Sequence, residues 1–211
     1  MNLFDKIQKE KYMVIDDFLS KEHVEEIQRR VINNDETFFS FTANSIGKFL
    51  EHGGPNEKIK QSKLKNIVYS SQLVHVLWHQ DSKKQDKSIL YDIAVGSVLY
   101  KLLKFQTNFI VHRAKINLKV PTLNTNKDSF DGPHVDTTVP HISLIFYLHD
   151  CDGDTFLLNE KDYSIYKRIS PKENRLLIFD GNIKHAAGFP ISSPYRYIIN
   201  YNIIPERSTN D

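Results

Sequence analysis

A histidine and an aspartate stand two residues apart in GPHVDTTVPH, residues 132–141, directly before the apolar run ISLIFYL. His134 offers an imidazole nitrogen and Asp136 a carboxylate oxygen, and both are common metal ligands in proteins. In an extended segment, residues i and i+2 point to the same side, about 7 Å apart along the chain. The spacing therefore predicts that both side chains close on one ion.

Chance also produces such pairs in a chain with 9 histidines, so the local geometry must separate them. His23 and Glu25 lie in a segment with strong helical signals, where residues two apart point about 200° apart. The pair His79 and Asp81 ends a second expected helix and is disfavoured for the same reason. His75 and His79 can share a helix face, but no H-E-x-x-H pattern accompanies them. We interpret both as core or surface histidines of that helix.

A third ligand must come from a distant part of the chain, and His185 is the candidate because it follows the buried run RLLIFD and a turn. Two histidines and one carboxylate leave three coordination positions open, the arrangement of non-haem Fe(II) oxygenases. A structural zinc would instead close its fourth position, for which Cys151 is the only cysteine. Both kinds of metal site are compatible with these residue types.

Arg196 follows His185 within the apolar segment SPYRYIINYNI. A guanidinium in such a strand calls for a partner, and a carboxylate that binds both arms of the fork is its natural one. The alternative is an arginine that faces solvent from an edge strand. The residue by itself does not decide between the two.

The first half of the chain is expected to be mainly helical. Residues 20–33 predict a helix capped by Ser20, and residues 70–80 and 88–104 predict two more from the spacing of their apolar residues. Residues 44–66 contain several glycines and lysines and predict a surface loop. These elements would pack outside a core supplied by the second half.

The second half changes to the period of strands. Apolar and polar residues alternate over 109–120, and short apolar runs follow at 142–148, 155–158, 175–179 and 195–204. Strands in succession without intervening helices indicate an antiparallel architecture. We therefore predict an α+β fold with a mainly β core: a double-stranded β-helix (jelly roll, cupin-like) with helices packed outside it.

These elements favour one domain over residues 1–211, with a mainly helical part over 1–105 and the jelly-roll core with the metal site over 106–205. The net charge of +2 is too small to indicate binding to nucleic acid. No stretch approaches the ~20 apolar residues that span a bilayer, and no signal peptide is recognised. A single cysteine forms no internal disulfide, so we expect a soluble, cytoplasmic protein.

The set His134-x-Asp136, His185 and Arg196, in this order and spacing, resembles the 2-oxoglutarate and Fe(II)-dependent dioxygenases, in particular their prolyl-4-hydroxylase-like branch. The likeness extends to the segments YMVIDDFLSKEHVEEIQ, SLIFYLHDCDGDTFLL and ISPKENRLLIFDGNIKH. It covers about residues 11–30 and 109–204 and leaves 35–105 without a counterpart.

The resemblance implies that His134, Asp136 and His185 bind Fe(II) and are the catalytic centre, and that Arg196 pairs with the distal carboxylate of 2-oxoglutarate. Tyr147 stands where some members offer a phenol to that carboxylate. Asn200 stands four residues after Arg196, where a hydroxyl residue is frequent, so its amide is the candidate for that contact. Gly153-Asp154 departs from the usual Gly-Gly at this turn.

The resemblance implies a reaction that consumes 2-oxoglutarate as cosubstrate together with O2, with ascorbate as a further candidate, and that hydroxylates a substrate with release of succinate and CO2. The substrate is unidentified, and a prolyl or other amino-acid side chain in a protein and a small molecule are both open. Two other classes remain: a cupin-like metal protein with chemistry that does not use 2-oxoglutarate, and a catalytically inactive jelly-roll binding module.

Three further features have two interpretations each. Arg113, Lys115 and Asn117 share one face of the strand before the triplet, and a solvated face is favoured over a pocket lining. The acidic segment 150–154 is interpreted as a turn, since it lacks the glutamate of a calcium loop. The polar segment 120–132 is either a lid over the site or a mobile connector.

Overall fold

The computed structural model describes residues 2–33, 37–42, 66–68, 70–80, 87–102, 104 and 108–206. The helices are α1 (Leu3–Glu10), α2 (Lys21–Val31), the π-helix η2 (Asp92–Gly96) and α4 (Ser97–Leu102). The strands are β1 (Tyr12–Ile15), β2 (Ser40–Thr42), β3 (Gln72–His79), β4 (Phe109–Lys119), β5 (Ile142–Tyr147), β6 (Thr155–Leu158), β7 (Ile165–Ile169), β8 (Arg175–Asp180), β9 (Lys184–Ala187) and β10 (Arg196–Pro205).

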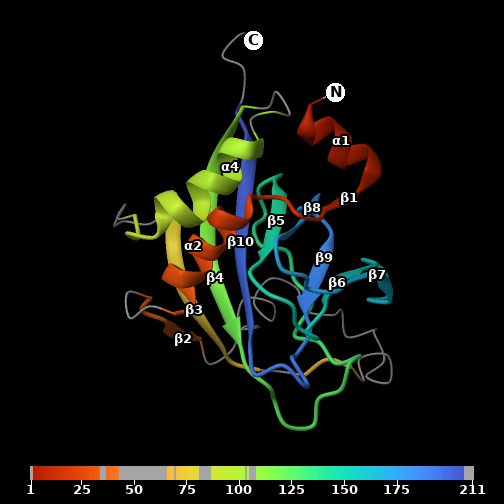
Figure 1. The fold of residues 1–211 in the computed structure, drawn as a ribbon. Coiled ribbons are helices and arrows are strands. Elements are labelled where there is room, and N and C mark those ends of the chain that lie inside the picture. Colours follow the sequence, from red (N-terminus) through yellow and green to blue (C-terminus); the bar gives the residue numbers. More distant parts are fainter. Residues whose placement is uncertain are drawn as a thin grey trace.

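The strands form two antiparallel sheets (Figure 1). The larger sheet has seven strands in the order β1-β8-β5-β10-β4-β3-β2, and the smaller has three in the order β7-β6-β9. Strands distant in the sequence become neighbours, since β10 lies between β4 and β5. This arrangement confirms the predicted mainly β core of double-stranded β-helix type, and it brings the ends of distant segments to one place.

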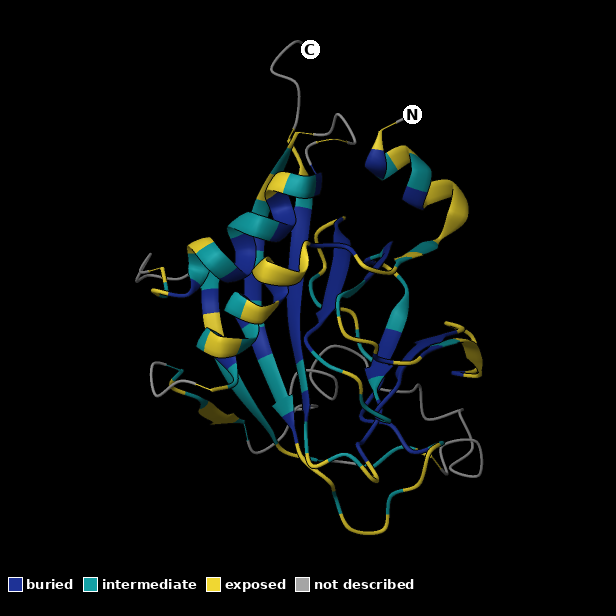
Figure 2. Ribbon diagram, viewed as in Figure 1, coloured by how far each residue is buried: buried dark blue, intermediate teal, exposed yellow. Residues whose placement is uncertain are grey.

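One face of the seven-stranded sheet is covered by helices. Figure 1 shows α2 and α4 lying across β3, β4 and β10, and Figure 2 shows that their sheet-facing sides are buried. The apolar residues of this layer form the largest core cluster of the described residues, to which β4 contributes Ala114 and Ile116 and β10 contributes Ile199, Tyr201 and Ile203. Because side chains alternate along a strand, the residues between them point to the opposite face, toward the smaller sheet.

The prediction of a helix over residues 70–80 is wrong, because this segment forms β3 and pairs with β2 and β4. The run QLVHVLWH is short, apolar and rich in β-branched and aromatic residues, and such a run fits a strand as well as a buried helix. His75 therefore does not lie on a helix face. Its ring nitrogens are 2.8 Å from the carbonyl oxygen of Phe38 and 2.7 Å from Oγ of Ser88.

The structure confirms helices in the other two predicted ranges. The helix over 20–33 is confirmed as α2, with Ser20 as its N-cap, and the helix over 88–104 contains η2 and α4. The loop predicted over 44–66 lies outside the described residues except for Asn66. The described residues of 1–105 thus contain both helices and strands. No helix in the described part of the chain has the length and apolar character that crossing a bilayer requires.

Candidate metal centre

His185 converges with His134 and Asp136, which lie in the segment that precedes β5. Their candidate ligand atoms all lie within 4.8 Å of one another, and among the described residues they form the one such group of three. His185 belongs to β9, whereas His134 joins that strand through an isolated antiparallel bridge. The two residues exchange backbone hydrogen bonds of 3.0 Å in both directions, and this pairing sets their rings 4.6 Å apart.

Each imidazole is held by a backbone carbonyl through Nδ1. For His134 the partner is the oxygen of Gly132 at 3.0 Å, and for His185 it is the oxygen of Ile183 at 3.4 Å. Because a carbonyl only accepts, the proton belongs on Nδ1 and the lone pair on Nε2. Metal-binding histidines in proteins are oriented in this way. Nε2 of His185 is 3.5 Å from Oδ2 of Asp136, close to the roughly 3 Å expected between two ligands of one ion.

Burial keeps both imidazoles neutral. It lowers the pKa of His134, and it lowers the pKa of His185 to about 3, assisted by the repulsion between the two rings. The side chain of Asp136 is 2% exposed. Burial by itself would raise the pKa of Asp136, but the positive charges of Arg113 and Lys115 hold it well below its usual range. The site therefore presents two neutral nitrogen ligands and one carboxylate at neutral pH.

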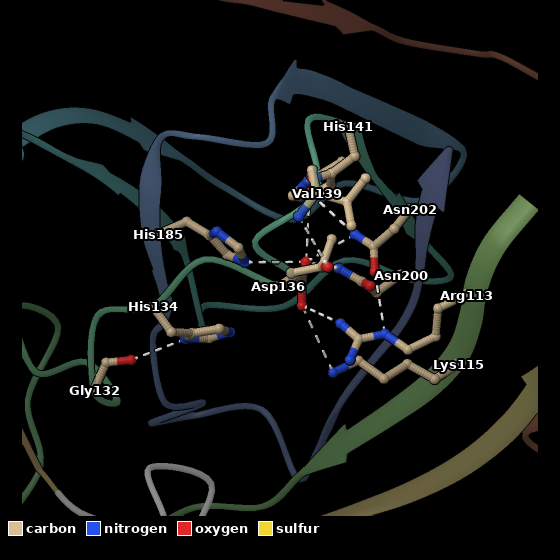
Figure 3. Close-up of polar contacts among 12 residues, drawn as sticks. Arg113, Lys115, Gly132, His134, Asp136, Val139, His141, His185, Asn200 and Asn202 are labelled. Atoms are coloured by element: carbon tan, nitrogen blue, oxygen red, sulfur yellow. Dashed lines mark hydrogen bonds and ion pairs between the residues drawn. The ribbon is translucent and has the colours of Figure 1, made fainter. Parts of the chain in front are cut away.

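The carboxylate of Asp136 is surrounded by donors from β4, β5 and β10 (Figure 3). Nη2 of Arg113 is 2.5 Å from Oδ1, and Nζ of Lys115 is 3.9 Å from the same oxygen. The amides of Asn200 and Asn202 donate to Oδ2 over 3.1 and 3.0 Å. These contacts fix the orientation of the carboxylate before any ligand binds.

The donor set fits a metal that keeps open positions. Two imidazoles and one carboxylate on one side of an ion leave room for other ligands, as in non-haem Fe(II) centres. Cys151, the only sulfur considered for a closed zinc site, is half-buried and is no member of the ligand group. The described residues thus favour the open site over the structural one.

Arg196 opens β10 and is 1% exposed. Its Nε donates to the oxygen of Gly153 over 2.6 Å, and Nη2 donates to Oγ1 of Thr155 over 2.9 Å. Tyr147 donates its hydroxyl to the same Thr155 oxygen over 2.7 Å. No ion pair between Arg196 and a carboxylate is found among the described residues. Since β10 lies inside the sheet, the alternative of a solvent-facing arginine on an edge strand is wrong.

Gly153 and Tyr147 both fit the surroundings of Arg196. A side chain at Gly153 would place its Cβ 2.8 Å from Cδ of Arg196, so this position has room only for glycine. Burial raises the pKa of Tyr147 to about 12, and its phenol therefore stays protonated and able to donate. The turn retains the first glycine of the expected pair. Asp154, in the second position, forms an ion pair with Arg168.

The amide nitrogen of Asn200 contacts Asp136, while its Oδ1 is buried with no hydrogen-bond partner among the described residues. The expected contact of Asn200 with the carboxylate of 2-oxoglutarate stays a prediction. The preference for a solvated face at Arg113 and Lys115 is wrong, because both side chains are at most 16% exposed and ion-paired with Asp136. Asn202 was not singled out, although its position two residues after Asn200 puts both amides on one face.

The segment 120–132 is fastened at its C-terminal end. Phe130 forms isolated β-bridges with Ile67 and Gly188. Oδ2 of Asp131 forms an ion pair with Nζ of the buried Lys119 over 2.5 Å. Farther toward the N-terminus, Leu123 is 88% exposed. Any lid would therefore be confined to the exposed part, and its role stays a prediction.

The acidic segment 150–154 forms a turn, as expected. Asp152 accepts hydrogen bonds from the backbone of Ile191 and Ser192, and Asp150 accepts one from the backbone of Glu173. These carboxylates are satisfied by the protein itself and tie three loops together.

Comparison with known proteins finds a family match in the second half of the chain. Residues 121–204 match the family described as the 2OG-Fe(II) oxygenase superfamily, where 2OG denotes 2-oxoglutarate. This range contains the three candidate metal ligands, Tyr147, Arg196 and Asn200. A search of curated proteins gives no match.

Solved structures share the fold at low sequence identity. An oxidoreductase of the 2OG-Fe(II) oxygenase family from Burkholderia pseudomallei is 10% identical with a TM-score of 0.62, covering 98% of this chain and 91% of that one. The viral collagen prolyl hydroxylase of Paramecium bursaria Chlorella virus-1, in complex with 2OG, is 13% identical with a TM-score of 0.52 and coverages of 95% and 99%. The epimerase SnoN, in complex with Fe3+, alpha ketoglutarate and nogalamycin RO, is 11% identical with a TM-score of 0.57 and coverages of 95% and 83%.

Proposed function

We propose that the chain hydroxylates a substrate with the part that matches the 2OG-Fe(II) oxygenase superfamily, residues 121–204. The metal would be Fe(II), and 2-oxoglutarate and O2 would be consumed, with ascorbate as a candidate reductant that keeps the iron ferrous. The single observation that carries the proposal is the convergence of His134, Asp136 and His185 in the same fold as a buried arginine without a carboxylate partner among the described residues.

His134, Asp136 and His185 would hold the iron. Their part is to supply two neutral imidazoles and one negative charge on one side of the ion, with the other positions left for the cosubstrate and O2. The bound iron supplies the oxidising chemistry, in which one oxygen atom of O2 enters succinate and the other enters the C–H bond of the substrate. The backbone partners of His134 and His185 keep both Nε2 lone pairs directed at the ion.

Arg196 would hold the distal carboxylate of 2-oxoglutarate. A buried guanidinium is costly unless a negative group compensates it, and the cosubstrate supplies that group. Tyr147 and Thr155 would complete the contact through their hydroxyls, which already form a chain with Arg196. Asn200 would act through Asp136 and orient the iron ligand. These roles fit a pocket that is complete only when the cosubstrate is bound.

The test is an anaerobic titration of the purified protein with Fe(II) and then with 2-oxoglutarate. Calorimetry measures the affinity at each step. Arg196→Met should weaken 2-oxoglutarate binding by more than about 100-fold, the scale of a lost buried charge pair, while the Fe(II) affinity changes little. Arg29→Met is the matched control, because Arg29 is an exposed arginine on α2, and it should leave both affinities unchanged.

Other outcomes separate the alternatives. Tight Fe(II) binding with no affinity for 2-oxoglutarate would favour a cupin-like metal protein with different chemistry. Binding of neither would favour an inactive module. Hydroxylation is measured as succinate and CO2 formed in equal amounts with hydroxylated product. A cytoplasmic location is also part of this proposal.

A further inference from the structure

The face of β4 that looks into the site carries cations close to the candidate metal. Arg113 and Lys115 are two residues apart and point to the same side, with side chains 16% and 14% exposed. Figure 3 shows both side chains converging on the carboxylate of Asp136. Their positive groups therefore lie within a few ångströms of the atom that would bind the iron.

Arg113 has donors to spare. Its Nε bonds to Oδ1 of Asn202 over 3.1 Å, and Nη2 bonds to Asp136 over 2.5 Å. A guanidinium has five N–H donors, and no other hydrogen bond of Arg113 is found among the described residues. The remaining edge of the fork is suited to a second carboxylate.

The single negative charge of Asp136 cannot both bind a metal ion and fully balance the neighbouring cations. When Asp136 binds a metal ion, its single charge is shared between that ion and the neighbouring cations. Arg113 then lies in a half-buried place with a weakened counter-ion, and an uncompensated charge in such a place is unfavourable. A ligand that brings its own negative group would restore the balance.

Two amide oxygens on the same face of β4 and β10 also have no hydrogen-bond donor among the described residues. Oδ1 of Asn117, two residues beyond Lys115 on β4, and Oδ1 of Asn200 are both buried with no hydrogen-bond partner among the described residues. Buried amide oxygens are normally satisfied. An amino or hydroxyl group on the ligand would satisfy them, whereas a plain fatty acid would not.

We propose that the primary substrate is a small carboxylic acid with an amino or hydroxyl group, and that Arg113 and Lys115 bind its carboxylate. This inference rests on the proposed function and deepens it by naming a substrate class. The position of the two cations, beside Asp136, would hold the carboxylate near the iron, and a C–H bond one or two carbons away would then be presented for oxidation. Arg196 serves the cosubstrate and is a separate site on β10.

The test is a binding measurement without oxygen. The protein, loaded with Fe(II) and saturated with 2-oxoglutarate, is titrated by calorimetry with a panel of free α-amino acids and 2-hydroxy acids, each paired with its carboxamide. We expect at least one acid to bind 10-fold or more tightly than its own amide. Equal binding of acids and amides, or no binding by any member, would overturn the proposal.

Lys115→Met is the diagnostic variant, because Nζ of Lys115 is 3.9 Å from Oδ1 of Asp136 whereas Nη2 of Arg113 is 2.5 Å from it, so the loss of Lys115 disturbs the metal ligand less. The variant should weaken the preferred acid by about 10-fold and leave the weak binding of its amide unchanged. The control is Lys161→Met, which removes an exposed lysine between β6 and β7, and it should change neither. An unaltered acid-to-amide ratio in Lys115→Met would contradict the assignment.

Phosphate is tested in a separate arm, in which phosphoserine is compared with serine. A clear preference for the phosphorylated compound would overturn the carboxylate assignment. The Fe(II) and 2-oxoglutarate affinities are measured first on the same preparation. If they are absent, the proposed function fails, and titration of the metal-free protein with the same acids then tests the cation pair by itself.

Discussion

Along β4 and the adjoining part of β10, the two faces of the seven-stranded sheet have opposite chemistry. On the helix-covered face, alternate residues of β4 and β10 are apolar and belong to the largest core cluster. On the other face, the residues between them are Arg113, Lys115 and Asn117 on β4 and Asn200 and Asn202 on β10. The register pairs Asn200 with Lys115 and Asn202 with Arg113.

The difference shows how one strand serves two purposes. The apolar face supplies stability through burial, and this leaves the polar face available for charged groups that contribute little to stability. Such groups are retained where they position a ligand rather than where they hold the fold. We expect substitutions on the first face to change unfolding and substitutions on the second to change binding.

The largest effect is expected on the apolar face. Phe146 on β5 is fully buried and packs against Phe18, so Phe146→Ala should lower the free energy of unfolding by about 3–5 kcal/mol. Phe38→Ala, at a position 79% exposed, should change it by less than about 0.5 kcal/mol. Urea unfolding measures both. If Phe146→Ala keeps the free energy of unfolding but loses Fe(II) affinity, then the apolar face does not serve stability alone.

The next effect is expected at the ligands. His185→Ala removes one of the three candidate donors and should weaken Fe(II) binding by more than about 100-fold, beyond the loss typical of an outer partner. Anaerobic calorimetry measures the affinity. The exposed His23 on α2 provides the control variant His23→Ala, for which no change is expected. An unchanged Fe(II) affinity in His185→Ala would remove His185 from the metal site.

A smaller effect is expected for a residue that orients a ligand. Asn202 donates to Asp136 and accepts from Arg113, so Asn202→Ala should weaken Fe(II) binding by roughly 10–100-fold. Asn182→Ala, at an exposed turn, should leave the Fe(II) affinity unchanged. If the Asn202 variant loses stability but no affinity for iron, then the polar face is structural rather than functional.

The smallest effect is expected at the end of a covering helix. Ser20 caps α2 by accepting from the backbone N–H of His23, and Ser20→Ala should cost about 1 kcal/mol of stability. Ser20→Asp restores an acceptor and is the matched rescue. Fe(II) and 2-oxoglutarate affinities of the folded protein should be equal in both variants, and a change in either would link the covering helix to the site.

Strand β4 was predictable because its side chains alternate over Phe109–Lys119, whereas β9, the short strand that bears His185, was not predicted. The helix α2 was predictable from its cap and its apolar spacing. The segment Gln72–His79 was not, because a short apolar run has no distinct period and is decided by its partners β2 and β4.

The same limit applies to the site. Spacing nominated His134 and Asp136, and the position after a buried run and a turn nominated His185. The resemblance added 2-oxoglutarate as the carboxylate partner of Arg196. The contact of Arg113 with Asp136 had no local signal, because the two residues lie on different segments and their distance depends on how the sheet closes.

Sequence by itself determined which residues carry chemistry and which face of each strand they share, since both follow from residue type and from the geometry of an extended chain. Tertiary structure alone decided which of them meet. The bridge between His134 and His185 and the neighbours of Asp136 arise from pairings between distant strands, and such pairings depend on the packing of the whole chain rather than on any one segment.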